Sequence, residues 1–184
     1  REGLIKSRAL YTSMERTGYF KCGNEDINKL YENIIWGQKS NYVEVPTDCP
    51  QRDERMGYTG DGHVFALTGA YNFNTDDFWR NWLKDLMLGQ KDNSEGYIGS
   101  TVPAQGKAGV GFLSMLGWGN AISIIPKMME SVFGDEEILK EIYPSLKTFV
   151  ECEIKRMKDD LWISPSLGDW LSLNGSMAWQ AMNN

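Results

Sequence analysis

Histidine is almost absent from this chain of 184 residues, which contains only His63. We therefore set aside a Ser-His-Asp catalytic site and a histidine-rich metal site. Cysteine is also scarce, and Cys22, Cys49 and Cys152 stand far apart, without metal-ligand spacing or an even disulfide framework. We expect free, mostly buried thiols in a reducing compartment, with no metal and no cofactor.

Long apolar runs and basic clusters are missing as well. No apolar stretch approaches the length needed to span a membrane, and the first residues do not resemble a signal peptide. The net charge of -6, without a Lys/Arg run, argues against nucleic acid as a partner. We expect neither a membrane nor a nucleic acid as partner and a cytoplasmic location. Secretion stays open, because the chain begins mid-pattern without Met.

Aromatic residues are abundant, with seven Trp, eight Tyr and seven Phe. Their rings either pack in a core or offer stacking surfaces for a flat or ring-shaped ligand. The hydrophobic content of 41% is ordinary for a soluble globular protein and is enough for one domain with a sizeable core.

Helical spacing of apolar residues dominates the chain after an extended segment over residues 5–20. Asn24 is expected to cap the first helix, Thr75 the third and Asp135 the last. Pro126 should kink one helix, and Pro144 should interrupt another. No alternating strand pattern follows residue 23, so the predicted fold class is all-α. Helices are predicted over residues 25–41, 64–71, 75–89, 120–133 and 135–158.

The most informative segment is residues 47–61, Thr-Asp-Cys-Pro-Gln-Arg-Asp-Glu-Arg-Met-Gly-Tyr-Thr-Gly-Asp. It holds four carboxylates and two arginines between apolar runs, and Pro and Gly break regular structure. A rigid polar loop between helices is a common place for binding or catalytic groups, although a solvated, salt-bridged loop is the simpler interpretation. Two further glycine-rich loops, over residues 89–118 and 161–173, carry Trp and Asp.

Carboxylates crowded in this way suit glycoside hydrolysis, which needs one protonated carboxylic acid and a second carboxylate. Neighbouring negative charges raise the pKa of one carboxyl, whereas Arg52 and Arg55 lower that of others. Calcium binding is an alternative for an acidic loop. The spacing lacks the ligand rhythm of known calcium loops, so we rank this alternative below catalysis.

The segment from Asp48 to Asp61 resembles the signature of the bacterial α-L-rhamnosidases of glycoside hydrolase family 78. Gly-Trp-Gly-Asn-Ala at 117–121 and Gly-Asp-Trp-Leu at 168–171 fit the same family, and residues 18–24 resemble the junction from a preceding β-rich domain. The resemblance implies an (α/α)6 barrel. It also implies an inverting hydrolysis with one glutamate as general acid and another as general base acting through water.

The resemblance implies roles for individual residues. Glu54 matches the general acid, and Tyr58 stands where the family commonly has Trp. Matches to residues that hydrogen-bond the rhamnose hydroxyls are Asp48, Arg52 and Asp61. Matches to aromatics that line the sugar pocket are Trp118 and Trp170.

No glutamate in the remaining motifs matches the general base, which the resemblance places beyond position 184. We therefore expect residues 1–23 to be a lead-in from a β-rich domain and residues 24–184 to be the first half of the barrel. Such a fragment would be inactive alone, and its exposed apolar faces favour self-association. Its partners would be rhamnose-containing glycosides or oligosaccharides. The rival hypothesis is a non-catalytic, carbohydrate-binding helical module.

Overall fold

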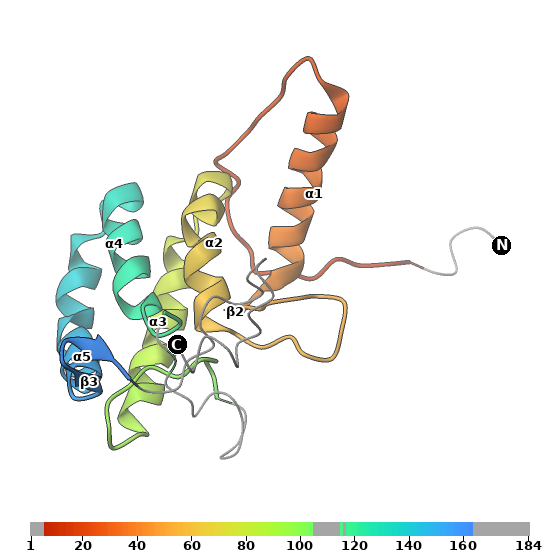
Figure 1. The fold of residues 1–184 in the computed structure, drawn as a ribbon. Coiled ribbons are helices and arrows are strands. Elements are labelled where there is room, and N and C mark those ends of the chain that lie inside the picture. Colours follow the sequence, from red (N-terminus) through yellow and green to blue (C-terminus); the bar gives the residue numbers. More distant parts are fainter. Residues whose placement is uncertain (1–5, 105–114, 116, 164–184) are drawn as a thin grey trace.

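The computed structural model describes residues 6–104, 115 and 117–163. This part of the chain is mostly helical, with two short hairpins (Figure 1). Its helices are α1 (Glu25–Asn41), α2 (Thr59–Asn72), α3 (Asp76–Lys91), α4 (Ala121–Phe133) and α5 (Glu136–Ile154). Its strands are β1 (Tyr42–Val43) with β2 (Val45–Pro46), and β3 (Met157–Lys158) with β4 (Leu161–Trp162), both pairs antiparallel. The predicted all-α class therefore holds in part: the described fold is mostly helical, and its two-residue strands are too short to show an alternating pattern.

Helix α1 has the predicted bounds because its start is encoded locally. The Asn24 side-chain oxygen accepts hydrogen bonds from the backbone N–H groups of Asp26 and Ile27, at 2.9 and 3.3 Å. Glu25 and Asp26 place negative charge at the positive end of the helix dipole, and Lys39 lies in the last turn. Capping and charge together fix this helix from sequence alone.

Helix α2 begins at Thr59, five residues before the predicted start, so its first turn lies inside the polar motif. Gly60 and Gly62 looked like helix breakers, but both are required by close packing. A Cβ on Gly60 would lie 2.6 Å from the indole nitrogen of Trp118, and a Cβ on Gly62 would lie 2.9 Å from the Trp82 ring. Long-range contacts thus override the local propensity of glycine.

Two other predictions about helix ends need correction. The Thr75 side chain makes no capping bond, and the Asn74 side chain instead accepts from the Asp76 N–H at 3.3 Å. Pro144 lies inside α5 without interrupting it, and α5 ends at Ile154 rather than at residue 158. Asp135 does cap α5, accepting from the Ile138 N–H at 3.2 Å. Pro126 likewise lies inside α4.

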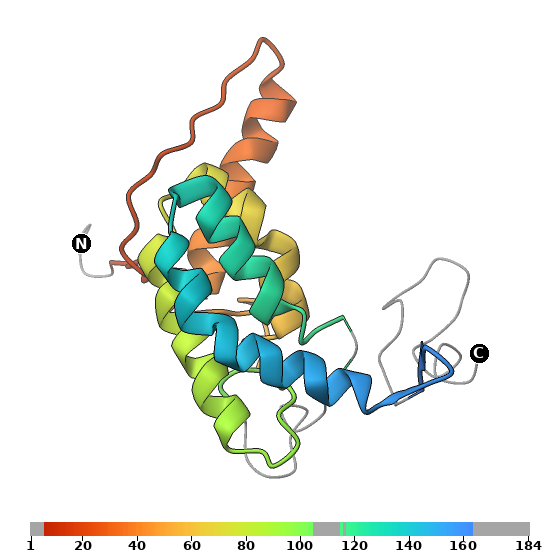
Figure 2. The ribbon, with the colours of Figure 1, turned by 90° about the vertical axis from the view of Figure 1, so that its left-hand side faces the viewer.

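The core lies where α4 packs against α2, α3 and α5 (Figures 1 and 2). Trp79 and Trp82 of α3 are fully buried, so these rings serve packing rather than ligand stacking. Tyr42 stacks on Phe78 with ring centroids 4.4 Å apart and nearly parallel planes. Full burial of these large aromatic side chains places the inner face of α3 in the core.

Helix α1 stands at the edge of the helical layer, beside the extended N-terminal segment (Figure 1). Gln38 connects it to α2: its amide donates to the Gly69 carbonyl at 3.1 Å and accepts from the Asn72 amide at 2.9 Å. Among the described residues, no helix is both long and apolar enough to cross a lipid bilayer.

Candidate active site

The polar motif forms a loop between β2 and α2 that closes on itself. The Asp48 N–H donates to the Met56 carbonyl at 3.1 Å, and the Met56 N–H donates to Asp48 Oδ1 at 2.9 Å. Only 8% of the Asp48 side chain is exposed. Asp48 therefore stabilises the loop with one carboxylate oxygen and leaves the other, Oδ2, for further contacts.

The end of the loop is fixed to residues 99–102, about forty positions away in sequence. The Val102 N–H donates to the Gly57 carbonyl at 2.8 Å, and the Thr59 N–H donates to the Ser100 carbonyl at 2.9 Å. The indole N–H of Trp82 donates to the Val102 carbonyl at 3.0 Å. Because Trp82 belongs to the core, these bonds hold the motif rigidly against the helical layer.

Arg52 bridges two carboxylates of the loop. Its guanidinium forms a short ion pair with Glu54 and lies 3.8 Å from Asp48 Oδ2. The Glu54 side chain is 31% exposed and Arg52 is 61% exposed, so the ion pair opens toward solvent. The charge of Glu54, followed by contact with Cys49, raises the pKa of Arg52. Arg55 braces this arrangement by donating from Nε to the Arg52 carbonyl at 3.1 Å.

Tyr58 and Asp61 belong to the same electrostatic cluster. Partial burial raises the pKa of Tyr58 to about 12, helped by a hydrogen bond to Glu54 and by the charges of Glu54, Asp48 and Asp61. Burial also raises the pKa of Asp61, against the effect of backbone hydrogen bonding at the start of α2, and the charges of Asp48 and Glu54 raise it further. The sequence predicted a carboxyl whose pKa is raised by neighbouring charges; for Asp61 those charges contribute, but desolvation is the larger cause.

Trp118 lies against the same helix end. Its indole packs on the backbone of Gly60, next to Asp61, because glycine leaves room for the ring. The Gly117 carbonyl, just before Trp118, lies 2.9 Å from His63 Nε2 in the first turns of α2. The turn before α4 is thus joined to the first turns of α2 by two contacts. Trp170, the other predicted pocket aromatic, lies outside the described residues.

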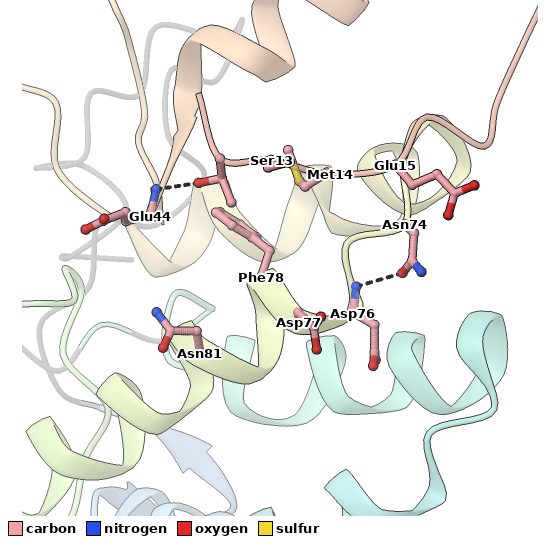
Figure 3. Close-up of a pocket in the computed structure, with 10 residues that line it drawn as sticks. Ser13, Met14, Glu15, Glu44, Asn74, Asp76, Asp77, Phe78 and Asn81 are labelled. Atoms are coloured by element: carbon pink, nitrogen blue, oxygen red, sulfur yellow. Dashed lines mark hydrogen bonds between the residues drawn. The ribbon is translucent and has the colours of Figure 1, made fainter. Parts of the chain in front are cut away.

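Two cavities differ in their relation to these residues. One of about 360 Å³ opens between α1 and α2 and includes Asp48 and Asp61 in its wall. The rest of that wall is largely apolar, with Ile34, Tyr42, Pro46, Val64 and Phe65. The other, of about 550 Å³, lies between the N-terminal segment and the start of α3 and contains none of the predicted site residues (Figure 3).

Sequence reasoning missed several groups that shape the site. Cys49 is 6% exposed, and its sulfur lies among the ligand atoms of Asp48 and Glu54. His63 and the strand-like contact with residues 99–102 were also not anticipated. Only the position of Cys49 inside the motif was a usable signal, since the other two depend on contacts between distant parts of the chain.

The site thus consists of a polar loop of acids and arginine that is fixed to a helical layer, with the half-buried Trp118 indole beside it. Residues 15–184 match the family described as the bacterial alpha-L-rhamnosidase 6 hairpin glycosidase domain, and the chain belongs to this family. The chain is thus part of an α-L-rhamnosidase six-hairpin glycosidase domain, as the motifs predicted.

Similar proteins agree in sequence and in fold. An alpha-L-rhamnosidase of Formosa agariphila is 37% identical over 170 residues, which are 91% of this chain and 18% of that protein. The Streptomyces avermitilis alpha-L-rhamnosidase complexed with L-rhamnose has a TM-score of 0.81 at 37% identity, over 88% of this chain and 15% of the other. The Aspergillus terreus enzyme gives 0.79 at 40% identity, over 88% and 18%. The chain therefore spans a fifth or less of the length of these relatives.

Proposed function

We propose that this chain is the first half of an (α/α)6-barrel catalytic domain in an inverting glycoside hydrolase that cleaves terminal α-L-rhamnosides. The observation that carries this proposal is the cluster in the loop before α2, where Arg52 pairs with both Asp48 and Glu54, in a chain of this family. The relative solved with L-rhamnose supports rhamnose as the sugar.

In this proposal Glu54 is the general acid, because it matches the acid of the family's motif and is more exposed than Asp48, the other carboxylate paired with Arg52. The remaining site residues bind the sugar: Asp48, Arg52 and Asp61 through its hydroxyls, and Tyr58, Trp118 and Trp170 through its ring faces. A general acid must hold a proton, so the Arg52 guanidinium has to turn from Glu54 toward a sugar hydroxyl when substrate binds. The high exposure of Arg52 permits that movement.

The general base belongs outside this chain in the same proposal. Inverting enzymes hold their two carboxyl groups roughly 6.5–9.5 Å apart, so that a water fits between base and sugar. Ligand atoms of Asp48 and Glu54 lie within 4.8 Å of each other, which is too close. That spacing is nearer to the one found in retaining enzymes, about 5–5.5 Å. Asp48, however, is buried, bonded to Met56 and faced by Arg52, which argues against it as a nucleophile.

The experiment compares Glu54→Gln with Asp61→Asn in the longer enzyme that includes the rest of the six-hairpin domain. Loss of the general acid should slow hydrolysis of an alkyl rhamnoside by roughly 10²–10⁴-fold. A dinitrophenyl rhamnoside, whose leaving group needs no proton, should be slowed much less by Glu54→Gln. If Asp61→Asn shows this leaving-group pattern and Glu54→Gln does not, Asp61 is the acid and the assignment fails. NMR of the first-formed anomer tests inversion.

The isolated 184-residue chain should be inactive on an aryl α-L-rhamnoside when assayed beside the longer enzyme. If the fragment hydrolyses the substrate and loses this activity when a second carboxylate within it is mutated, the general base lies inside the 184-residue chain. The rival, a non-catalytic sugar-binding module, predicts that the longer protein binds rhamnosides without hydrolysing them. Calorimetry with L-rhamnose, run beside the activity assay, separates the two.

A further inference from the structure

One group in the motif has no part in the sugar chemistry proposed above. Cys49 is 6% exposed, and its sulfur, one oxygen of Asp48 and one oxygen of Glu54 all lie within 4.8 Å of one another. The side chain of Asp48 is also largely enclosed, with 8% of it exposed. Two of the three groups are therefore enclosed by protein, unlike the carboxylates of an ordinary acidic surface.

The three groups match the ligand set of a thiophilic divalent cation. Zinc takes thiolate sulfur at about 2.3 Å and carboxylate oxygen at about 2.0–2.2 Å, usually with four ligands. Ligand atoms on one zinc ion are consequently separated by less than about 4.5 Å, the sum of two such bonds. The separations here need only a small contraction, and the solvent-facing side of Glu54 leaves room for a water as fourth ligand.

The loop holds two of these groups in place without help from a ligand. Asp48 Oδ1 is bonded to the Met56 N–H, which leaves Oδ2 directed to Arg52 at 3.8 Å, beyond hydrogen-bond distance. Cys49 follows Asp48 directly in the same closed loop. Little conformational entropy is lost when a cation binds to ligands that are already ordered, which favours affinity.

We propose that Asp48, Cys49 and Glu54 bind one Zn²⁺ or Cd²⁺ ion in place of the Arg52 guanidinium. Binding releases the thiol proton of Cys49 to solvent and turns Arg52 outward, so that a divalent cation replaces a monovalent one between the two carboxylates. The ion and a sugar then exclude each other, because the ion uses the oxygens of Asp48 and Glu54. This exclusion rests on the proposed function, whereas cation binding rests on the geometry alone.

The other cysteines supply matched controls. Cys152 is also buried, 3% exposed, and has Glu153 and Arg156 nearby, much as Cys49 has Glu54 and Arg52. Among the described residues, however, no set of three close ligand atoms includes Cys152 or Cys22. If a buried thiol beside an acid were enough to bind a cation, Cys152 would therefore bind one as well.

The test is a calorimetric titration of the chain with ZnCl₂, paired with a CdCl₂ titration that follows the ultraviolet cadmium–thiolate absorption. The double variant Cys22→Ser/Cys152→Ser should bind one ion with unchanged affinity. Cys49→Ser should abolish the absorption and weaken zinc binding by more than the roughly 10–100-fold typical of losing an outer-shell partner. Arg52→Ala should tighten zinc binding, because it removes the guanidinium that competes with the ion. Circular dichroism checks that each variant folds.

Unchanged zinc binding in Cys49→Ser, loss of binding in the double variant, or no binding by a folded wild-type chain would each overturn the proposal. In the longer enzyme, zinc should raise the KM for an aryl rhamnoside without lowering kcat. Zinc binding to the chain without this competition leaves the metal site standing and contradicts the sugar site. Suppose that zinc competes with the sugar for binding to the longer enzyme. If Glu54→Gln removes this competition and Cys49→Ser does not, the metal site alone is rejected.

Discussion

Replacing Gly57 by alanine should detach the motif from the helical layer. A Cβ on Gly57 would lie 2.2 Å from the Val102 carbonyl oxygen, whereas Cβ atoms essentially never approach closer than 3.0 Å. The obstacle is backbone, so no side-chain rotation relieves it, and the two segments must separate by about 0.8 Å. That movement stretches the 2.8 Å bond from the Val102 N–H to the Gly57 carbonyl beyond hydrogen-bond length.

The cost follows from these contacts. Overpacking costs typically 1–3 kcal/mol, and a lost hydrogen bond about 0.5–1.5 kcal/mol. The lower backbone entropy of alanine in the unfolded chain offsets roughly 0.4–1 kcal/mol. We therefore expect Gly57→Ala to lower the free energy of unfolding by about 2 kcal/mol, within a range of roughly 0.5–4 kcal/mol.

Urea unfolding followed by tryptophan fluorescence measures this change, and Trp82 reports on it directly because its indole donates to the Val102 carbonyl. The matched control is Gly37→Ala in α1, where a Cβ would meet nothing within 4 Å. Helix propensity predicts that this control gains up to about 1 kcal/mol. A Gly57→Ala chain within 0.5 kcal/mol of wild type would refute the reasoning.

Two further predictions concern the start of α2. Gly60→Ala should displace the Trp118 indole, because its Cβ would lie 2.6 Å from the indole nitrogen. Tryptophan fluorescence should change, and the free energy of unfolding should fall by roughly 1–3 kcal/mol. The double variant Gly60→Ala/Trp118→Ala should recover part of that loss. Asp61→Asn should stabilise the chain at pH 7, because the raised pKa of Asp61 means that its ionisation opposes folding. This gain should disappear below the ordinary pKa of aspartate, about 3.9, because the carboxyl is then protonated in both the folded and the unfolded state. A gain that persists in unfolding curves measured below that pH would contradict the electrostatic explanation.

Local signals were sufficient wherever the structure is determined by neighbours in sequence. Asn24 with two following acids identified the start of α1, and Asp135 identified that of α5. The helix predicted over residues 75–89 corresponds to α3, and Trp79 and Trp82 lie on its buried face. The motif gave Asp48, Arg52 and Glu54 as neighbours, because a single closed loop of fifteen residues cannot separate them far.

Contacts between segments that are distant in the sequence could not be predicted from it. The start of α2 depends on Trp82 and Trp118 packing onto Gly62 and Gly60, and glycine alone signals a turn as readily as a close approach. The bond between residues 57 and 102 joins positions that no periodicity relates. Pro144 was read as a break, yet α5 continues through it because packing in the helix outweighs one missing backbone bond.

The described fold leaves two apolar helix faces open near the polar loop. Ile27, Leu30 and Ile34 recur at helical spacing on α1 and are 37–58% exposed. Val64, Leu67 and Tyr71 do the same on α2 and are 47–76% exposed. Apolar side chains at such spacing are the usual packing face of a helix, so these two rows are surfaces on which further helices would pack. The cavity beside Asp48 and Asp61 opens between the same two helices. A further layer of helices there would bury both apolar rows and would also form one side of the proposed sugar site. The proposed catalysis and the expected self-association of the isolated chain therefore depend on the same two faces.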